Sequence, residues 1–170
     1  MLFRSRVKIA VLLSGGVDST VAALLLQEKG YEVTGLTMIN WDTGVVAKAA
    51  AAAKSLGIEH LVIDLQEQFK KQVIDYFISV YEQGQTPNPC VVCNRYIKFG
   101  SLLDYALDMG FDRVATGHYA RIEYDEERKR YLLRKGKDLR KDQSYFLYAL
   151  NQEQLRHTLF PLGELTKSER

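Results

Sequence analysis

The chain carries KIAVLLSGGVDSTVAALLL at residues 8–26. Residues 8–13 form an apolar run typical of a buried strand, and residues 20–26 have the apolar pattern of a helix. Between them, Gly15 and Gly16 allow a tight turn that exposes successive backbone N–H groups. The N-terminus of the following helix adds about half a positive charge. The stretch therefore predicts a strand, a turn and a helix, with a turn that binds phosphate without a lysine.

The glycine-rich turn differs from the common phosphate-binding loops. It lacks the G-x-x-x-x-G-K-[ST] pattern of P-loop proteins and the G-x-G-x-x-G pattern of dinucleotide-binding folds. Its residues SGGVDS, at positions 14–19, resemble instead the PP-loop of enzymes that split ATP into AMP and diphosphate to adenylate a substrate. The alternative is a turn that only connects a strand to a helix.

Apolar runs alternate with helical segments along the first part of the chain. We expect strands at residues 7–13, 32–38 and 60–65, with helices at residues 20–29 and 47–56. Such a βαβαβ order requires right-handed crossovers and a parallel sheet that is buried on both faces. The expected fold class is therefore α/β, a doubly wound parallel sheet with helices on both faces.

The remaining residues continue this pattern with one insertion. The expected elements are a helix at 66–81, a loop at 82–90, a helix at 94–109, a strand at 113–116, a small hairpin insertion near 119–135, a short helix at 141–150 and a further turn at 152–159. Because no linker or repeat interrupts them, residues 1–170 are expected to form one domain. Residues 160–166 resemble the approach to a helix N-cap at Thr166, so we expect the domain to continue into a longer enzyme.

Bulk composition excludes several protein classes. With 170 residues, 46% hydrophobic and 26% charged, the chain fits one packed domain rather than a disordered segment. No apolar run reaches the roughly 18 residues of a membrane span, and the basic start leads to no cleavage site. We therefore expect a cytoplasmic protein with no membrane partner. In a reducing compartment its two cysteines, Cys90 and Cys93, are more often reactive or metal-binding than a structural disulfide.

Basic residues are concentrated between Arg128 and Lys141. This segment holds eight lysines and arginines and one acid, Asp138, so its net charge is +7 in a chain whose net charge is +2. Such a concentration is typical of a surface that binds the phosphate backbone of a nucleic acid. A solvated hairpin rich in basic residues is the alternative.

The cysteine loop TPNPCVVCNR, residues 86–95, is the second segment with reactive side chains. If a helix begins at Cys93 or the next residue, the positive helix end lies near its sulfur, together with Arg95 and Lys98. These charges predict a lowered pKa and a nucleophilic thiolate. Structural zinc would need a second pair of ligands, an Fe–S cluster would need ligands from outside the chain, and a thioredoxin-like dithiol remains an alternative.

Ligands of open parallel sheets bind at the carboxyl ends of the strands. At that edge, the backbone of residues 15–17 and the hydroxyls of Ser14 and Ser19 are expected to hold diphosphate, with Asp18 helping to hold Mg²⁺. The backbone near Met38 is expected to contact adenine, a core position being the alternative. His118, after Gly117, is expected to contact phosphate or a base, or else to be a satisfied, partly buried histidine. We assign no metal-ligand set.

Six ordered motifs closely resemble the tRNA-specific 2-thiouridylase family. They are SGGVDS at 14–19, GLTM at 35–38 with NWD at 40–42, TPNPCVVCN at 86–94, GHYAR at 117–121, KDQSYFL at 141–147 and FPLG at 160–163. The resemblance spans nearly all of the chain, but it corresponds to the N-terminal part of such enzymes, which continue into a central segment and a β-barrel. It implies an adenine nucleotide alpha hydrolase-like, PP-loop fold, in which residues 1–170 are the ATP-pyrophosphatase domain.

The resemblance also implies a reaction and its site residues. The reaction is ATP-dependent 2-thiolation of the wobble uridine of tRNA, by adenylation of the uracil 2-oxygen and transfer of persulfide sulfur from a cysteine. The implied ATP-binding residues are Leu12, Leu13, Ser14, Gly15, Gly16, Val17, Asp18, Ser19, Met38 and Gly117. The implied catalytic residues are Cys93 and Cys90. The implied tRNA-binding residues are Asn88, Pro89, Cys90, His118, Lys141, Asp142 and Gln143.

The implied cofactors are ATP and Mg²⁺, with an Fe–S cluster as an alternative use of the cysteines. The implied partners are tRNA and a persulfide sulfur donor protein. The chain departs from the family pattern in its cysteines. The family uses a second catalytic cysteine from a later segment, but no cysteine follows Cys93 here. Cys90, where many relatives have aspartate, is then a resolving thiol, a cluster ligand or a variant. The alternatives to a thiolation enzyme are a catalytically incomplete ATP- or tRNA-binding domain and another PP-loop ATP-pyrophosphatase, which leaves the cysteine loop unexplained.

Overall fold

A computed structural model describes residues 7–40 and 43–169. Trp41 and Asp42, which belong to one of the family motifs, lie outside the described residues. The larger elements of the first half are β1 (Lys8–Leu12), α1 (Val17–Glu28), β2 (Glu32–Ile39), α2 (Gly44–Leu56), β3 (His60–Asp64), α3 (Gln66–Phe69), η1 (Lys70–Ile74) and α4 (Asp75–Glu82). Those of the second half are α5 (Pro89–Val92), η2 (Cys93–Ser101), α6 (Leu102–Asp108), β4 (Arg113–Ala115), β5 (Ala120–Asp125), β6 (Arg130–Lys135), η3 (Ser144–Leu147), α7 (Gln152–Arg156), β7 (Thr158–Leu159), η4 (Pro161–Glu164) and η5 (Lys167–Glu169).

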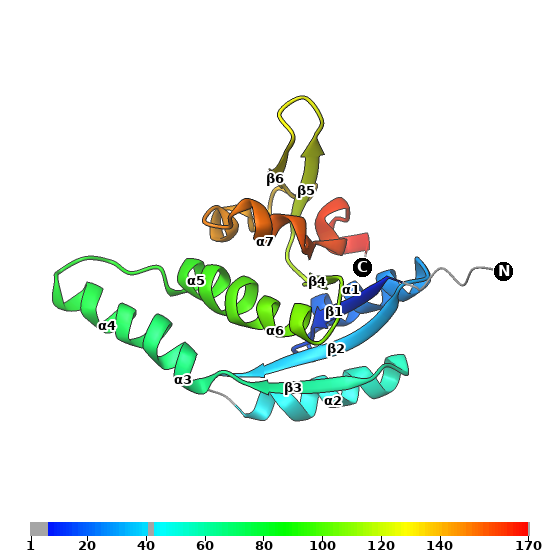
Figure 1. Ribbon diagram of the computed structural model, residues 1–170, viewed down its shortest axis with the longest axis horizontal. Helices are drawn as coiled ribbons and strands as arrows, with labels where there is room; N and C mark the ends of the chain where they lie inside the picture. Colours follow the sequence, from blue (N-terminus) through cyan, green and yellow to red (C-terminus); the bar gives the residue numbers. More distant parts are fainter. Residues whose placement is uncertain (1–6, 41–42, 170) are drawn as a thin grey trace.

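Five parallel strands form the central sheet, in the order β3-β2-β1-β4-β7 (Figure 1). β1 lies between β2 and β4, with Ala10 opposite Thr34 on one side and Val114 on the other. The chain reverses its direction of travel across the sheet after β3, which places β1 and β4 at the switch point of the strand order. The predicted doubly wound α/β fold is confirmed.

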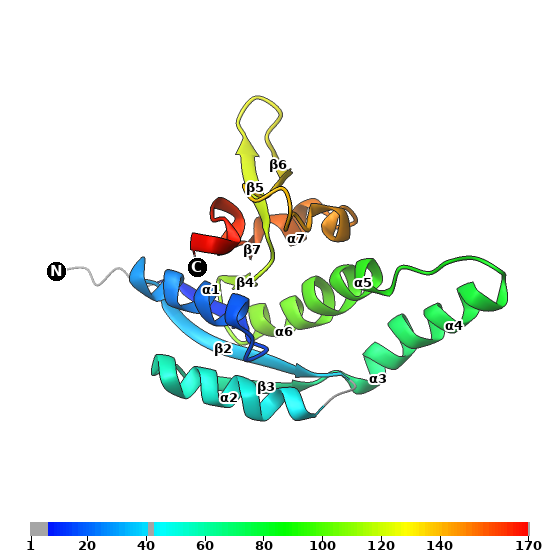
Figure 2. The ribbon, with the colours of Figure 1, turned by 180° about the vertical axis from the view of Figure 1, so that it is seen from behind.

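Helices cover both faces of this sheet, and the alternation of residues along β1 determines which face each side chain joins. Ile9 and Val11 pack with Leu26 of α1 on one face, which α2 also covers (Figure 2). Ala10 packs on the other face with Ile97 of the helix that follows the cysteine loop. Complete burial of a valine or isoleucine side chain, as at Val11 and Ile9, contributes about 1.5–3 kcal/mol. These contacts hold β1 firmly between the two helical layers.

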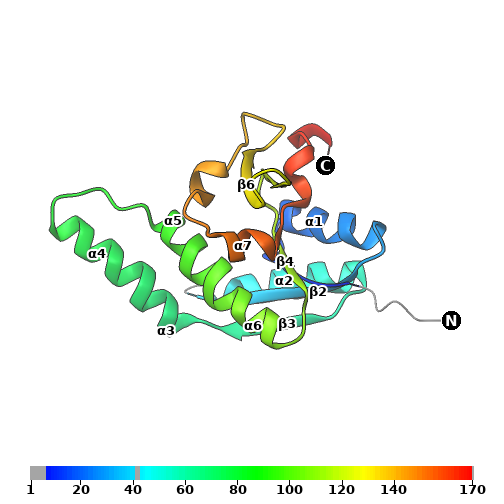
Figure 3. The same ribbon diagram turned by 45° about the horizontal axis from the view of Figure 1, so that its top comes forward.

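Two long helical rods lie side by side on the second face and are joined by the loop at residues 83–88 (Figures 1 and 3). The first rod comprises α3, η1 and α4, and the second comprises α5, η2 and α6. The second rod begins at Pro89, earlier than the expected start at residue 94. Asn88 caps it by accepting a hydrogen bond from Val91 N at 3.3 Å, and proline suits the first helical position because its missing N–H needs no partner there.

The part of the chain after β4 forms the hairpin and the edge of the sheet. The predicted hairpin is present as β5 and β6 and projects from the body (Figure 1). The predicted helix at 141–150 is wrong, because the Asp142 carboxylate accepts hydrogen bonds from Gly136 N at 2.8 Å and Ser144 Oγ at 2.7 Å and fixes a turn instead. Only the short 3₁₀ turn η3 follows it. The sequence also did not reveal β7, whose two residues are too few for a periodic pattern.

Within the described part of the chain, every helix is too short or too polar to span a lipid bilayer. The expected cytoplasmic location stays a prediction.

Candidate active site

The glycine-rich turn follows β1 as predicted. Gly15 has a φ of +73°, in the left-handed region that glycine adopts without strain. A Cβ atom at this position would lie 2.5 Å from the backbone carbonyl carbon of Lys48, so α2 packs directly against the turn. Gly16 is the N-cap of α1, and no side chain caps that helix. The turn therefore presents the N–H groups of the first helical turn to the carboxyl edge of the sheet.

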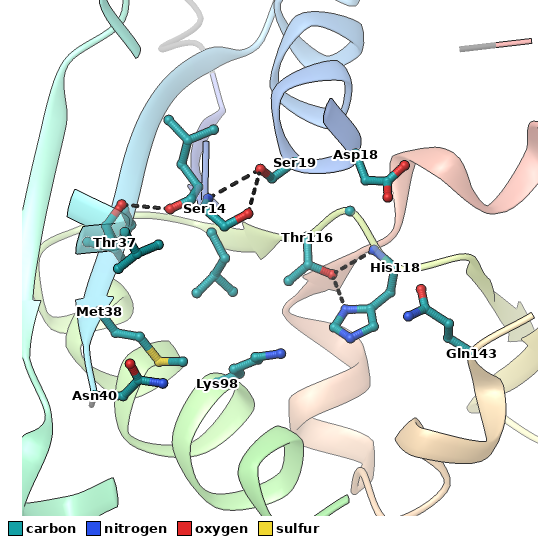
Figure 4. Close-up of a pocket in the computed structure, with 15 residues that line it drawn as sticks. Ser14, Asp18, Ser19, Thr37, Met38, Asn40, Lys98, Thr116, His118 and Gln143 are labelled. Carbon is teal, nitrogen blue, oxygen red and sulfur yellow. Dashed lines mark hydrogen bonds between the residues drawn. The ribbon is translucent and has the colours of Figure 1, made fainter. Parts of the chain in front are cut away.

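Serine hydroxyls hold the turn in this shape (Figure 4). Ser19 Oγ accepts a hydrogen bond from Ser14 N at 3.2 Å and donates one to Gly16 O at 3.0 Å. The two serine hydroxyl oxygens lie 3.2 Å apart. The side chain of Asp18 points toward the start of the hairpin, where its Oδ1 accepts a hydrogen bond from Tyr119 Oη at 2.9 Å. The loop is thus tied to the segment that carries the predicted tRNA contacts.

A cavity of about 440 Å³ opens between this turn and the ends of β2 and β4. We call it the nucleotide cavity. Several of the predicted ATP-binding residues line it, namely Leu12, Leu13, Ser14, Asp18, Ser19, Met38 and Gly117. Gly15, Gly16 and Val17 belong to the same turn but do not line the cavity in its present shape. Thr37, Asn40, Val45 and Thr116 line it as well, and sequence reasoning assigned them no role.

Gly117 is the point at which β4 meets the PP-loop. A Cβ atom here would lie 2.8 Å from the carbonyl carbon of Asp18 and 2.9 Å from the backbone nitrogen of Ser19. Neither backbone atom can move without displacing the first turn of α1. Glycine is therefore required by this close approach, as the sequence suggested.

A second cavity, of about 520 Å³, lies beside the first and is lined by Pro89, Cys90 and Cys93. We call it the cysteine cavity. Phe146 of η3 also lines it, and Asn94 Nδ2 donates a hydrogen bond to Phe146 O at 3.0 Å, which fixes η3 against the second rod. The residues that line both cavities are Met38, Asn40, Lys98, His118 and Gln143. A nucleotide in the first cavity would therefore adjoin a group held in the second.

The thiol of Cys93 differs from expectation in its pKa. Burial raises the pKa of the Cys93 thiol, the positive charge of Lys98 lowers it, and Cys90 adds a smaller raising contribution. The expected net lowering of the pKa is wrong, because burial of the thiol outweighs the charge of Lys98. The helix also begins at Pro89, so Cys93 lies one turn inside it rather than at its positive end. Cys90 is exposed and precedes Cys93 by three residues, a spacing that places neighbouring side chains on one helix face.

Sequence reasoning placed Lys98 near Cys93 but gave it no role in the nucleotide cavity. Its side chain extends into the nucleotide cavity between Met38 and His118 (Figure 4), and it also lines the cysteine cavity. Among the residues that the structure describes, no hydrogen bond or ion pair engages its ammonium group. Lys98 and Cys93 both lie in η2, a π-helical segment, in which backbone bonds link residues five apart. The sequence pattern gave no sign of this local geometry.

The imidazole of His118 is neutral at physiological pH. Its Nδ1 lies 2.8 Å from Thr116 Oγ1, and the rings of Phe99 and Phe160 pack around it. Burial, assisted by the positive charge of Lys98, lowers the pKa of His118 to about 3. At neutral pH the imidazole therefore offers hydrogen bonds but no positive charge to a phosphate.

The other predicted tRNA contacts have defined structural partners. Besides Asn88 and Asp142, described above, Gln143 Oε1 accepts a hydrogen bond from Tyr119 N at 3.0 Å. Lys141 and Asp142 lie outside both main cavities and line a smaller one of about 330 Å³, next to Asp18 and Arg140. Gln143 lines all three cavities and so connects them.

The side chains present limit which of the implied metal groups the chain can hold by itself. Within residues 7–40 and 43–169, no three His, Cys, Asp or Glu side chains form a group that could hold a metal ion. The chain has two cysteines, so its own thiolates do not suffice for an Fe–S cluster, which usually takes four. Asp18 at the PP-loop is compatible with Mg²⁺, because that ion is commonly held by one or two carboxylates together with substrate phosphates.

The parallel sheet, the glycine-rich turn and the cavity at the carboxyl ends of the strands define an α/β nucleotide-binding protein of the PP-loop class. Comparison with known families agrees with this class. Residues 7–170 match the model of a family described as "tRNA methyl transferase HUP domain". The chain belongs to this family.

Curated relatives confirm the resemblance to tRNA-specific 2-thiouridylases. The chain is 61% identical over 162 residues to a protein of that name, MnmA, from Syntrophomonas wolfei, and the match covers 95% of this chain and 48% of the relative. It is 51% identical to MnmA 1 of Caldanaerobacter subterraneus over 177 residues, which are 95% of this chain and 49% of the relative. The chain thus spans about half the length of the curated relatives it matches.

Among solved structures, a predicted subunit of tRNA methyltransferase from Methanocaldococcus jannaschii has a similar fold. The TM-score is 0.60 at 20% identity, and the match covers 96% of this chain and 71% of the other. At this identity the likeness supports the fold alone.

Proposed function

We propose that the protein catalyses ATP-dependent 2-thiolation of the wobble uridine of tRNA, and that residues 1–170 are the nucleotide-binding domain of a longer enzyme. The observation that carries the proposal is the adjoining pair of cavities, one at the PP-loop and one at Cys93, with Lys98, His118 and Gln143 in their common wall. Relatives at 61% and 51% identity are named for this activity. Two cavities that share a wall suit a reaction in which one group is activated and then attacked.

ATP fits the nucleotide cavity by its chemistry. The exposed N–H groups at the start of α1 suit the β- and γ-phosphates, and the apolar side chains of Leu12 and Met38 suit the adenine ring. Mg²⁺, held by Asp18 and the phosphates, would neutralise charge on the diphosphate leaving group.

In the proposed first step, the uracil 2-oxygen attacks the α-phosphorus of ATP, and diphosphate leaves. This converts a poor leaving group into a good one. The terminal sulfur of a persulfide on Cys93 then attacks C2 of the base, and the C2–O bond breaks to release AMP. Lys98 lies where it can stabilise negative charge on both the sulfur and the departing phosphate.

The resulting disulfide between Cys93 Sγ and the transferred sulfur must break to free the product. We propose that the Cys90 thiolate attacks Cys93 Sγ, which releases the thiolated base and leaves a Cys90–Cys93 disulfide. An external thiol would then reduce that disulfide, and a sulfur donor protein would reload Cys93. The exposed position of Cys90 suits contact with such partners.

The products of ATP cleavage test the proposed function. Incubating the protein with α- and γ-labelled ATP should yield AMP and diphosphate in amounts that depend on added tRNA. ADP and phosphate as the products would contradict the PP-loop assignment. Products that form without RNA but with ammonia as acceptor would favour the alternative of an amidotransferase-type synthetase.

Two other functions are alternatives to thiolation. A catalytically incomplete binding domain would bind ATP or tRNA without forming AMP. Methyl transfer, which the family description mentions, is less well supported, because it leaves the PP-loop and the cysteine cavity without a role.

Replacing Lys98 by methionine should slow alkylation of Cys93 at neutral pH. Because the charge of Lys98 lowers the pKa of the Cys93 thiol, its loss raises that pKa further and leaves less thiolate. The measurement is the rate of iodoacetamide labelling against pH, in a Cys90→Ser background so that one thiol reacts. Lys98→Arg keeps the charge and serves as control. An unchanged pH midpoint in Lys98→Met would rule out this electrostatic coupling.

Replacing Arg140 and Lys141 by glutamine should weaken tRNA binding and flatten its salt dependence. Both side chains lie beside Asp18 at the edge of the site, where they can reach backbone phosphates. Each lost phosphate contact lowers the slope of log K against log salt by about 0.7 to 0.9. Fluorescence anisotropy with labelled tRNA at several salt concentrations measures the slope. A slope equal to that of the wild type would refute the contact.

A further inference from the structure

A second basic surface lies along the hairpin, away from the two site cavities. It consists of adjoining depressions of about 290 and 750 Å³ that share Tyr124, Tyr131 and Arg156. We define the hairpin groove by six of its lining residues, which are Arg113, Tyr124, Lys129, Arg130, Tyr131 and Arg156. None of these residues belongs to one of the family motifs. None of them lines the nucleotide cavity or the cysteine cavity.

The four cations of the hairpin groove are exposed and, in the part of the chain that the structure describes, are not neutralised by an ion pair. Within the described residues, no ion pair engages Arg113, Lys129, Arg130 or Arg156. By contrast, Arg121 pairs with Glu164 at 3.3 Å, and Arg128 pairs with Asp125 at 2.9 Å. Exposed cations without acidic partners are available for an anionic ligand.

Two tyrosines lie among these cations. The rings of Tyr124 and Tyr131 pack edge to face with centroids 4.9 Å apart, and Tyr124 remains 43% exposed. Flat amphipathic rings beside lysine and arginine side chains are suited to the sugars and phosphates of a nucleic acid.

The hairpin divides the basic segment of residues 128–141 into two separate contact areas. The strands pair from Ala120 opposite Lys135 to Asp125 opposite Arg130, a length of about 17 Å at about 3.4 Å per residue. Lys129 and Arg130 therefore lie at the far end of the hairpin, which projects from the body (Figures 1 and 3). Arg140 and Lys141 instead line the small cavity beside Asp18. The basic segment, which looks continuous in the sequence, therefore forms two separate basic areas, one at each end of the hairpin.

We propose that the hairpin groove binds the sugar-phosphate backbone of tRNA at a distance from the base that enters the cysteine cavity. This inference rests on the proposed function for the identity of the RNA, but not on the thiolation chemistry. With phosphate contacts at both ends of the hairpin, a rigid stem would be held at a fixed angle to the site. The target base would then be positioned by contacts that do not read sequence.

The test is tRNA binding by a triple variant, Lys129→Gln/Arg130→Gln/Arg156→Gln. At low salt its affinity should fall about tenfold or more, and the slope of log K against log salt should decrease by about two to three. Labelled tRNA and fluorescence anisotropy over about 50 to 200 mM salt give both quantities. The variant Lys8→Gln/Lys54→Gln/Lys71→Gln removes three exposed charges from elsewhere and should bind as the wild type does.

Thermal unfolding should be unchanged in the groove variant, because the substituted side chains are exposed. If this variant lowers its melting temperature, Lys129→Gln/Arg130→Gln alone, which leaves α7 intact, gives the deciding measurement. Wild-type affinity and slope in the folded variant would overturn the inference and indicate a protein partner or no partner for this surface. Because no ATP is present, these outcomes are independent of whether the wild type forms AMP and thiolated tRNA.

Discussion

The Cys93→Ser variant is expected to form 2-thiouridine at a rate at least about a thousandfold below that of the wild type. A serine hydroxyl cannot carry sulfane sulfur, and no other cysteine follows in this chain. The side chain is half-buried and the exchange replaces sulfur by oxygen, so the cavity should keep its shape. Mass spectrometry of nucleosides from tRNA treated with ATP and a persulfide donor measures the product.

The Cys90→Ser variant is the matched control for this prediction. If Cys90 is the resolving thiol, its loss should permit transfer of sulfur to the base but block release, so that RNA accumulates in a disulfide with Cys93. Non-reducing gels detect this species, and added thiol should dissolve it. ATP binding should be the same in both variants, because neither cysteine lines the nucleotide cavity. Undiminished thiolation by Cys93→Ser would end the proposed mechanism.

The first half of the fold could be predicted because each of its elements has a local cause. The apolar run of β1, the glycines of the turn and the apolar period of α1 each specify their own conformation. The nucleotide cavity follows from these elements by the rule that parallel strands end at one edge. The edge strand β7 has no such local signal, because its two residues pair with β4 only through the packing of the whole C-terminal part.

The cysteine cavity was predictable only in part, for reasons that lie in the helix after the loop. Both cysteines were recognised, but the helix start depends on whether Pro89 or Asn94 begins it, and the Asn88 cap selects Pro89. With this start Cys93 lies inside the helix and is largely buried, and its burial raises the pKa of the thiol against the lowering effect of Lys98. Lys98 was expected as a nearby charge, but the sequence pattern indicated neither the π-helical segment that holds it nor its place in both cavities.

Replacing Gly15 by alanine is expected to abolish detectable ATP binding. The φ of +73° costs an alanine about 1–2 kcal/mol, and its Cβ would lie 2.5 Å from the Lys48 carbonyl carbon. The added methyl group must therefore displace either α2 or the turn, and the N–H groups that face the phosphates move with the turn. Isothermal titration calorimetry with ATP and Mg²⁺ measures the affinity.

Gly57 provides a control that separates the two effects of the alanine. It ends α2 with a φ of +65°, so Gly57→Ala suffers the same backbone strain, but no atom lies within 4 Å of the added Cβ. This variant should lose about 1–2 kcal/mol of stability and bind ATP as the wild type does. Loss of ATP binding in Gly15→Ala alone assigns the effect to the contact between α2 and the turn. Equal ATP affinity in the two variants would show that the turn tolerates a side chain and that its close packing is not needed to hold the phosphates.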